Sequence, residues 1–366
     1  MEKISIILKF LYKSLVRYFF KLLYGKVIYE EAISTDECIT VNKINNDNVL
    51  KLNNKKYQVY KLTNGRVYTD FVENVALINK NKILNSVSYQ QINGQLKSSQ
   101  FNSTIYTGTP KFKRKINGKI LSLTQGASGH KNYFHWLFDI LPKIKLYSEI
   151  YDIKSLDYFY LSKLEEFQKK TLQILGLNRI KILDANKYRH VEANELFAVE
   201  HPWYTKGHIL DEAKNLPPWI IHWIRDSFLK SAIKFNANEK IFIDRSESRF
   251  NHCQFQNNNE ITTFLINKGF SIYKIGQLSF EQQIYLFQKA KVIVGAHGAA
   301  FANLVFCSPK TKVIEIKPSI HPNYVSRTIS KINDLEIKIL EMPSIKKDNN
   351  NKGDIFLDIK ELNRNL

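Results

Sequence analysis

Four short apolar runs alternate with three helical patterns between residues 240 and 316, and this alternation limits the fold more than any other feature. The runs span 240–243, 271–275, 292–294 and 312–316, and the helical patterns span 260–268, 280–290 and 299–306. Strands that alternate with helices form parallel sheets with right-handed crossovers. The sequence therefore predicts half of a doubly wound α/β sheet, whose ligands bind beyond the carboxyl ends of the strands.

Two local signals mark the ends of these helices. Ser279 precedes the second helical pattern and Gln282 lies at its third helical position, which is the spacing of a capping box. Gly269 follows the first helical pattern, where a glycine commonly ends a helix. Periodicity and end signals thus predict the same elements.

The junction between the third strand and the third helix exposes backbone at the predicted binding edge. It reads Gly295-Ala296-His297-Gly298-Ala299. A strand that turns directly into a helix aims N–H groups and the positive end of a helix dipole at a ligand, usually an anion. The imidazole of His297 adds a donor that can carry charge near neutral pH. We therefore expect Gly295, His297, Gly298 and Ala299 to bind an anionic group.

An arginine pair follows the strand at 240–243, at the same edge of the sheet. The chain holds 10 Arg against 44 Lys, yet Arg245 and Arg249 lie four residues apart here. A guanidinium suits phosphate better than an ammonium does, so these residues favour a phosphorylated ligand. The alternative is that they form surface salt bridges with Asp244 or Glu247.

Glu315 near the end of the last strand and the absence of three motifs further limit which classes of ligand are expected. Glu315 lies where a carboxylate can bind both hydroxyls of a ribose, although strand-end acids without a ligand are as common. The sequence contains neither G-x-G-x-x-G nor a P-loop, which disfavours hydride chemistry and nucleotide hydrolysis. It also contains no Asp-x-Asp, so we expect a nucleotide diphosphate held by basic groups without a metal or a cofactor.

The N-terminal half combines a β-rich portion with a second strand–helix alternation. Residues 28–123 carry short alternating runs, such as 57–62 and 67–71, separated by turn residues. Strands predicted at 120–123, 157–161 and 179–183 then alternate with helices predicted at 132–147 and 164–175.

His135 and Asp139 lie four residues apart on the first of these helices and therefore share a face. A carboxylate beside an imidazole fixes its tautomer and raises its basicity, which makes a general base near neutral pH. The alternative is a structural pair that braces the helix. Trp136 and its aromatic neighbours form either the wall of a sugar site or plain core.

Residues 1–25 carry a separate signal. Lys9, Lys13, Arg17 and Lys21 stand four apart within an otherwise apolar stretch, so a helix would carry one basic stripe. The stretch is too interrupted to span a bilayer and has no small-residue cleavage site. A basic amphipathic helix on an anionic membrane surface fits this pattern, and a helix packed on its own domain is the alternative.

Length and composition bound the remaining possibilities. A chain of 366 residues is expected to form two domains, and we place the boundary near Pro217. We predict an N-terminal helix at 1–25, domains at 26–216 and 217–345, and a polar tail with a short helix at 346–366. Three cysteines with no metal-ligand spacing suit a reducing compartment. The net charge of +20 reflects either solvated lysine faces or an anionic partner, and no nucleic-acid motif is present.

Four segments resemble glycosyltransferase family 61, in the order typical of that family. They are Asn132-Tyr133-Phe134-His135-Trp136-Leu137-x-Asp139-x-Leu141-Pro142-Lys143; Arg245 with Ser248-Arg249 and Asn259-Glu260-Ile261; Leu278-Ser279-Phe280-x-Gln282-Gln283-Ile284; and Val294-Gly295-Ala296-His297-Gly298-Ala299 through Asn303 to Val313-Ile314-Glu315. The resemblance covers residues 125–320.

The resemblance implies two Rossmann-like domains facing a cleft, the GT-B arrangement, with an acceptor-side domain at 26–216 and a nucleotide-sugar domain at 217–345. It implies inverting, metal-independent transfer from a nucleotide diphosphate-sugar to a glycan or lipid-linked acceptor, as in surface polysaccharide synthesis of bacteria. His135 or Asp139 would be the base, Asn132 and Trp136 would lie on the acceptor side, and Asn303 would join the donor-binding residues. We therefore expect a cytoplasmic enzyme, peripheral on the inner face of the cell membrane.

Two other functions compete with this interpretation. A non-catalytic sugar-nucleotide-binding scaffold would keep the turn around His297 but would not need the pair of His135 and Asp139. A basic adaptor for membranes or nucleic acid would bind in a salt-sensitive way without any effect of nucleotides.

Overall fold

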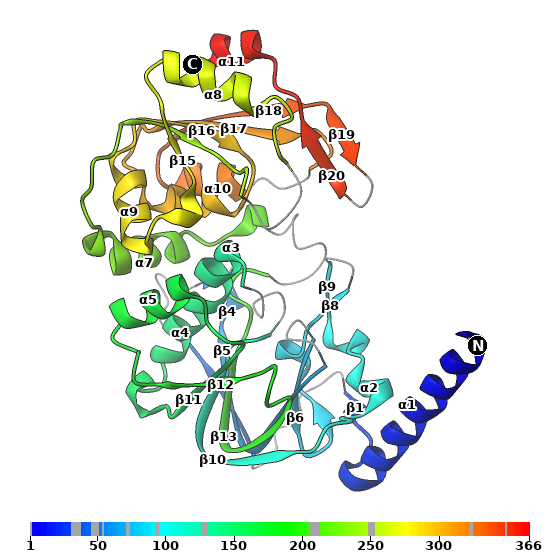
Figure 1. Ribbon diagram of the computed structural model, residues 1–366. Helices are drawn as coiled ribbons and strands as arrows, with labels where there is room; N and C mark the ends of the chain where they lie inside the picture. Colours follow the sequence, from blue (N-terminus) through cyan, green and yellow to red (C-terminus); the bar gives the residue numbers. More distant parts are fainter. Residues whose placement is uncertain are drawn as a thin grey trace. The chain divides into compact units, whose positions relative to one another are not determined.

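The computed structural model describes residues 2–30, 38–44, 51–52, 55–70, 74–92, 95–125, 131–204, 213–247, 253–321, 325–347 and 350–366. The protein is mixed α/β, as predicted, and its chain divides into two compact units (Figure 1). Unit 1 comprises Met1–Glu165 and Gly176–Glu212, and unit 2 comprises Glu166–Leu175 and Ala213–Leu366. The cleft between two Rossmann-like domains stays a prediction.

Unit 2 is built on a five-stranded sheet in the order β15-β14-β16-β17-β18, with every neighbouring pair parallel. Its strands are β14 (Lys240–Ile243), β15 (Ser271–Tyr273), β16 (Val292–Ala296), β17 (Lys312–Pro318) and β18 (Glu336–Met342). The chain order along the sheet is 2-1-3-4-5, so the direction of winding reverses between β14 and β16. This reversal is the switch point at which doubly wound sheets bind ligands.

Unit 2 also contains helices and short 3₁₀ segments. They are α5 (Glu166–Ile174), η6 (Ala213–Asn215), α7 (Pro218–Phe228), η7 (Leu229–Ser231), α8 (Asn258–Asn267), η8 (Ile275–Gln277), α9 (Phe280–Lys289), η9 (Ala299–Phe306) and α10 (Val325–Ile332). The predicted capping box of Ser279 and Gln282 is confirmed, and Gly269 follows α8 with φ +82°. The segment predicted as the third helix, η9, is a 3₁₀ helix.

The C-terminal residues contain more structure than the predicted polar tail. Strands β19 (Ser344–Lys347) and β20 (Asn350–Ile355) pair antiparallel, and helix α11 (Ile359–Asn365) follows. Ile355, Leu357 and Leu362 are buried in the apolar cluster that also contains Phe242 of β14. The hairpin and the last helix therefore complete the core of unit 2, because they cover apolar side chains of its sheet.

Unit 1 contains a nine-stranded mixed sheet in the order β1-β7-β6-β5-β13-β10-β11-β12, with β2 paired to β5. The strands are β1 (Ile28–Tyr29), β2 (Ile39–Lys43), β5 (Gln58–Thr69), β6 (Val75–Asn79), β7 (Lys82–Ile83), β10 (Arg114–Ser122), β11 (Tyr158–Leu161), β12 (Lys181–Asp184) and β13 (His190–Val199). Strand β10 runs parallel to both β11 and β13, whereas β13 and β5 are antiparallel. Two small hairpins pair β3 (Lys51–Leu52) with β4 (Lys55–Lys56), and β8 (Gln90–Ile92) with β9 (Gln95–Lys97).

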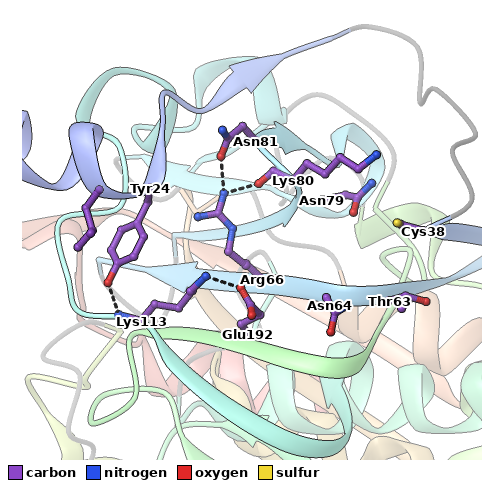
Figure 2. Close-up of a pocket in the computed structure, with 11 residues that line it drawn as sticks. Tyr24, Cys38, Thr63, Asn64, Arg66, Asn79, Lys80, Asn81, Lys113 and Glu192 are labelled. Atoms are coloured by element: carbon purple, nitrogen blue, oxygen red, sulfur yellow. Dashed lines mark hydrogen bonds and ion pairs between the residues drawn. The ribbon is translucent and has the colours of Figure 1, made fainter.

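Helix α1 (Glu2–Tyr24) confirms the predicted N-terminal helix. Its last turns contact unit 1: the buried ring of Phe20 meets Phe112, and Tyr24 lines a pocket with residues of β5 and β6 (Figure 2). Many of its other apolar side chains are exposed, so the helix packs on its own domain through its last turns. Among the described residues, none of the helices combines the length and apolar character needed to cross a membrane.

The remaining helical segments of unit 1 are short. They are η1 (Asn85–Val87), η2 (Ser99–Phe101), α2 (Thr104–Thr107), α3 (Tyr133–His135), the π-helix η4 (Trp136–Ile140), α4 (Leu141–Ser148) and η5 (Ile153–Ser155). Segments α3, η4 and α4 follow one another directly and occupy the helix predicted at 132–147. Helix α5 also lies near its predicted range, but it belongs to unit 2, where Lys170 pairs with the buried Glu281 of α9 at 2.7 Å.

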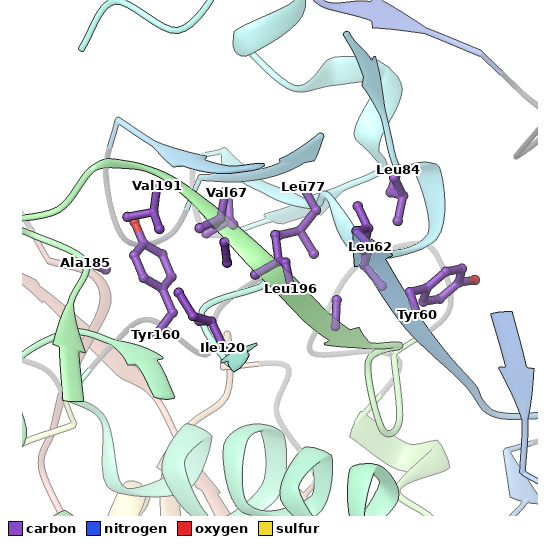
Figure 3. Close-up of a cluster of buried hydrophobic side chains, with 14 of the residues drawn as sticks. Tyr60, Leu62, Val67, Leu77, Leu84, Ile120, Tyr160, Ala185, Val191 and Leu196 are labelled. Atoms are coloured by element: carbon purple, nitrogen blue, oxygen red, sulfur yellow. The ribbon is translucent and has the colours of Figure 1, made fainter. Parts of the chain in front are cut away.

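The core of unit 1 lies against the centre of its sheet (Figure 3). Tyr60 and Leu62 of β5 meet Leu196 of β13 and Ile120 of β10 in this cluster. The sequence predicted two strands at 57–62 and 67–71, but Gln58–Thr69 is one strand paired with β13. Asn64 takes φ +52° in the middle of this strand, so the apparent turn residues are a local irregularity within a continuous pairing.

Candidate functional site

Two parallel neighbours in unit 1, β10 and β13, end at the same edge of the sheet. The segment with α3 and η4 follows β10, and His201 and Trp203 follow β13. Because parallel strands align their carboxyl ends, this topology brings the two segments together. The same rule that predicted a site in unit 2 therefore identifies a site in unit 1.

Asn132 begins the helical segment. Its side chain accepts hydrogen bonds from the backbone N–H groups of Phe134 and His135 at 2.9 and 3.4 Å, so it is an N-cap. The turn then widens into a π-helix, in which Leu141 N–H donates to the carbonyl of Trp136. Pro142 has no N–H for an α-helical bond, and single π turns often occur at functional sites. Asn132 thus positions His135 through the backbone.

His135 and Asp139 form the predicted pair. Nδ1 of His135 lies 2.7 Å from Oδ2 of Asp139, and the His135 side chain is 21% exposed while that of Asp139 is fully buried. Burial on its own would raise the pKa of Asp139, but the His135 and His201 contacts outweigh it and hold this pKa well below its usual range. Asp139 is therefore a buried carboxylate, and only the imidazole reaches the surface.

Two further donors face Asp139 from the segment after β13. Nε1 of Trp203 donates to Oδ1 of Asp139 at 2.8 Å, and Nε2 of His201 lies 3.6 Å from Oδ2. Nδ1 of His201 accepts from the backbone N–H of Tyr204 at 3.0 Å, so the proton of this imidazole is on Nε2. Asp139 is thus surrounded by N–H groups, and its contact with His135 requires the Nδ1–H tautomer of that ring. Nε2 of His135 is then an acceptor.

Lys143 lies one helical turn beyond Asp139 and is fully buried. Its Nζ donates to the backbone carbonyl of Gln125 at 3.1 Å. Burial lowers the pKa of Lys143 to about 7, although the nearby charge of Asp139 opposes the shift. A lysine in this position changes charge near neutral pH and contributes to the electrostatics of the site.

The structure changes the predicted role of Trp136. We expected it on the acceptor side, but its side chain is fully buried in the core. The rings of Phe134 and Trp203 lie next to the pair instead, with centroids 6.2 Å apart, and Phe134 is half-buried. A π turn rotates successive side chains differently from an α-helix, so spacing within the sequence did not predict which aromatic ring faces outward.

The second site lies at the switch point of unit 2, where β14 is followed by Arg245 and β16 by His297. Gly295 lies inside β16 and not in the turn, and a Cβ there would stand 2.9 Å from Cβ of Ile243. Nη1 of Arg245 donates to the carbonyl of His297. A Cβ on Gly298 would stand 1.4 Å from the same Nη1, so only glycine permits this packing. Arg245 thus braces the turn.

His297 forms a second imidazole–carboxylate pair. Its Nδ1 lies 2.5 Å from Oε1 of Glu315, and its side chain is 10% exposed. The other oxygen of Glu315 accepts from Ser326, and Glu315 is fully buried. The ribose contact expected for Glu315 is therefore wrong for this structure, because both oxygens face protein donors. The ring of His321 lies 4.3 Å from that of His297, between centroids.

The remaining residues that were predicted to bind the nucleotide-sugar donor do not all lie at the turn after β16. Ala299 begins η9 and is half-buried beside Gly298, where N–H groups of the first turn face away from the helix. Asn303 is fully buried, and its amide donates to Gln283 at 3.1 Å, so it joins η9 to α9 and is not placed for ligand contact. Arg249 lies outside the described residues.

The two acidic residues next to Arg245 in the sequence accept hydrogen bonds from residues other than Arg245. Asp244 accepts from Ser246 at 2.8 Å, while Glu247 accepts from Lys274 and Gln277. Among the described residues, no group of three or more His, Cys, Asp and Glu side chains is arranged to hold a metal ion.

Comparison with known proteins agrees with the motifs at both sites. Residues 133–314 match the family model for Glycosyltransferase 61. This match covers just under half of the chain. A stretch of 66 residues, which is 18% of the chain, is 35% identical to the beta-1,2-xylosyltransferase RCN11 of Oryza sativa subsp. japonica. The chain spans only 12% of the length of that relative.

The matched segment contains two residues that the motif analysis missed. His201 and Trp203 contact Asp139, but nothing in their spacing from Asp139 marks them in the sequence. One signal was present: His201-Pro202-Trp203-Tyr204 begins two residues after the end of β13. His321 and Ser326, just beyond the segment, were also missed, because their partners lie on other elements.

Proposed function

We propose that the protein is a glycosyltransferase that moves a sugar from a nucleotide diphosphate-sugar to an acceptor hydroxyl, with His135 as the general base. One observation carries this proposal: an outward-facing imidazole whose inner nitrogen is held 2.7 Å from a buried carboxylate. The family 61 match over residues 133–314 supports the reaction class.

The geometry favours His135 over Asp139 as the base. Asp139 is fully buried and faces N–H groups of His135, Trp203 and His201. A carboxylate in that environment is a weak base and has no path to a hydroxyl group. Nε2 of His135, in contrast, is an acceptor on a side chain that is 21% exposed. Asp139 therefore orients the base and stabilises the imidazolium that forms.

Unit 2 is proposed to bind the donor at the turn after β16. The imidazole of His297, whose Nδ1 lies 2.5 Å from Oε1 of Glu315, would contact the diphosphate. The first N–H groups of η9, at Ala299 and Ala300, would contribute further donors. Arg245 holds the carbonyl of His297 and thereby fixes the shape of this turn. These groups would balance the charge that builds on the leaving group.

The proposed reaction is a single displacement. The acceptor oxygen forms a bond to the anomeric carbon while its proton passes to Nε2 of His135. The bond between the anomeric carbon and the diphosphate oxygen breaks, and the nucleoside diphosphate leaves with the electron pair. Attack opposite the leaving group inverts the configuration at the anomeric carbon. We propose no metal in this step, and a lipid-linked or glycan acceptor of surface polysaccharide synthesis.

The test combines donor binding with turnover in the full-length protein. A thermal-shift screen against nucleoside diphosphates and their sugars, nucleoside diphosphate-pentoses included, identifies the donor. Release of the nucleoside diphosphate in the presence of acceptor glycans then measures turnover with and without EDTA. His135→Ala should lower turnover about a hundredfold or more and leave the thermal shift unchanged. Unchanged turnover in this variant would remove His135 from the chemistry.

His222 provides a matched control, because it is an exposed histidine of α7 in unit 2. His222→Ala should change neither the thermal shift nor turnover. A non-catalytic sugar-nucleotide scaffold is the second candidate, and it would give the thermal shift without releasing nucleoside diphosphate from any donor.

We also propose that α1 brings the enzyme to an anionic membrane surface. Its exposed apolar side chains include Phe10, Leu15 and Leu22, which are 68%, 69% and 71% exposed. Lys9, Lys13 and Arg17 are exposed on the same helix. Apolar burial and attraction to anionic lipids act together in such helices. Deleting residues 1–24 should abolish sedimentation with anionic liposomes, and persistent binding would contradict the proposal.

A further inference from the structure

A polar pocket of about 400 Å³ lies at the end of α1 in unit 1 (Figure 2). Leu23 and Tyr24 from the last turn of α1 form part of its wall. The volume lies within the range of about 300–1,000 Å³ that small-molecule sites occupy. The pocket belongs to neither of the two sites described above.

Arg66 of β5 lies at the centre of this pocket and is only 5% exposed. Its Nη2 donates to the carbonyl of Lys80 and, at 2.8 Å, to the side-chain oxygen of Asn81. Both of these acceptors are neutral, and the opposite charge that acts on the guanidinium is that of Glu192, its cross-strand partner on β13. Burying a charged guanidinium is costly unless it interacts with an opposite charge.

The other charged groups of the wall leave an excess of positive charge. Lys80 is exposed at the rim, and Lys113 pairs with Glu192, the acidic residue of the lining. Lys115 lies 3.4 Å from the same carboxylate, so two lysines compensate the charge of Glu192. Arg66 and Lys80 therefore set the electrostatic character of the pocket.

The neutral groups of the pocket suit an oxyanion. Asn64 and Asn79 supply amide donors beside Arg66, and Thr63 supplies a hydroxyl. An arginine with neighbouring amide and lysine donors matches the three terminal oxygens of a phosphate monoester. A phosphate diester presents only two such oxygens and carries less charge.

We propose that this pocket binds the phosphate monoester headgroup of an anionic lipid at the surface where α1 lies. The same residues join the two features, because Leu23 and Tyr24 are both the last turn of the exposed apolar helix and a wall of the pocket. A lipid headgroup next to an inserted helix lies at the depth where such a pocket would meet it. The helix supplies general membrane affinity, and the pocket supplies selectivity for the headgroup.

The test measures sedimentation of the full-length protein with three kinds of vesicle. These are phosphatidylcholine alone, phosphatidylcholine with phosphatidylglycerol, and phosphatidylcholine with phosphatidic acid at matched surface charge. The wild-type protein should bind the phosphatidic acid vesicles at least about fivefold more tightly than the phosphatidylglycerol vesicles. Arg66→Gln should lose this preference and keep the affinity of the wild-type protein for phosphatidylglycerol. An unchanged preference in this variant would overturn the proposal.

Arg66 is buried, so Lys80→Gln at the exposed rim provides a second variant that leaves the core intact. It should reduce the preference for phosphatidic acid by about twofold to threefold, whereas Lys154→Gln, at an exposed lysine of η5, should not change it. Equal effects of Lys80→Gln and Lys154→Gln would contradict a specific pocket.

Soluble glycerol 3-phosphate distinguishes a lipid from a free phosphate compound. Added in excess, it should weaken binding to phosphatidic acid vesicles and leave phosphatidylglycerol binding unchanged. Tight calorimetric binding of glycerol 3-phosphate to a wild-type protein that shows no headgroup preference would overturn the lipid assignment. Neither result depends on sugar transfer, so failure here is separate from failure of the proposed function.

Discussion

Nε1 of Trp203 lies 2.8 Å from Oδ1 of Asp139, although 64 residues separate the two in the sequence. This hydrogen bond joins the segment after β13 to the helix after β10. It restrains the carboxylate that contacts His135, so the orientation of the proposed base depends on a residue far away in the chain. Both partners are buried, which makes the loss of the bond costly.

Removing the N–H donor of Trp203 should therefore impair His135 as the proposed base. Trp203→Phe keeps an aromatic ring and removes the N–H group. We expect turnover to fall about tenfold and the free energy of unfolding to fall by about 1–3 kcal/mol, because a buried acceptor loses its partner. A loss of stability with unchanged turnover would show a purely structural role.

Glu315 should act through His297 and not through the ribose. Glu315→Gln retains the shape of the side chain but removes the carboxylate that contacts Nδ1 of His297. We expect the affinity for the nucleoside diphosphate to fall about tenfold, measured by calorimetry, because the imidazole would lose the charged partner that orients it. Glu336→Gln, at an exposed position of β18, serves as the control. Equal affinities of wild-type protein and Glu315→Gln would refute this role.

Gly298 should be required by Arg245. A Cβ at Gly298 would stand 1.4 Å from Nη1 of Arg245, so Gly298→Ala must displace the guanidinium from the carbonyl of His297. We expect weaker binding of the nucleoside diphosphate by about tenfold. Gly276→Ala is the matched control, because a Cβ there meets nothing within 4 Å.

A double-mutant cycle separates this clash from other effects of Gly298→Ala. In an Arg245→Ala background the extra methyl group has no guanidinium to displace, so Gly298→Ala should then cost little. Additive losses in the double variant would mean that the two residues act independently.

Lys143 should make stability depend on pH. Burial lowers its pKa from about 10.5 to about 7, so between these values the unfolded chain binds a proton that the folded protein lacks. The free energy of unfolding therefore rises with pH across this interval. Lys143→Met should remove this rise, which denaturant titrations between pH 7 and pH 10 would detect. Lys154→Met, at an exposed lysine, should retain it, and parallel curves for all three proteins would contradict the assignment.

Local features of the sequence predicted many elements of the fold. The strand at 240–243 has the predicted bounds, and the capping box at Ser279 formed as expected. The His135–Asp139 pair also follows from helical spacing. These predictions succeed because residues within one turn or one strand determine them, through hydrogen bonds and periodic burial.

Contacts between segments that lie far apart in the chain could not be predicted from local sequence features. Strand pairing of β13 with β10 brings Trp203 and His201 to Asp139, and no local pattern specifies which strands become neighbours. The burial of single side chains could not be predicted either: Trp136 and Asn303 belong to the motifs and were expected at the sites, yet both are fully buried. Spacing shows which residues share a helix face, but only packing decides whether that face meets solvent.

The sequence by itself determined the α/β class, the order of the elements in unit 2 and the residue types at its switch point. The tertiary structure decided which residues of both candidate sites reach the surface and which are buried beneath them. Asp139 contacts His135 and Glu315 contacts His297 from buried positions, because a buried carboxylate needs hydrogen-bond donors from neighbouring elements. Those donors come from strands and helices that the fold, and not the order of the chain, makes adjacent.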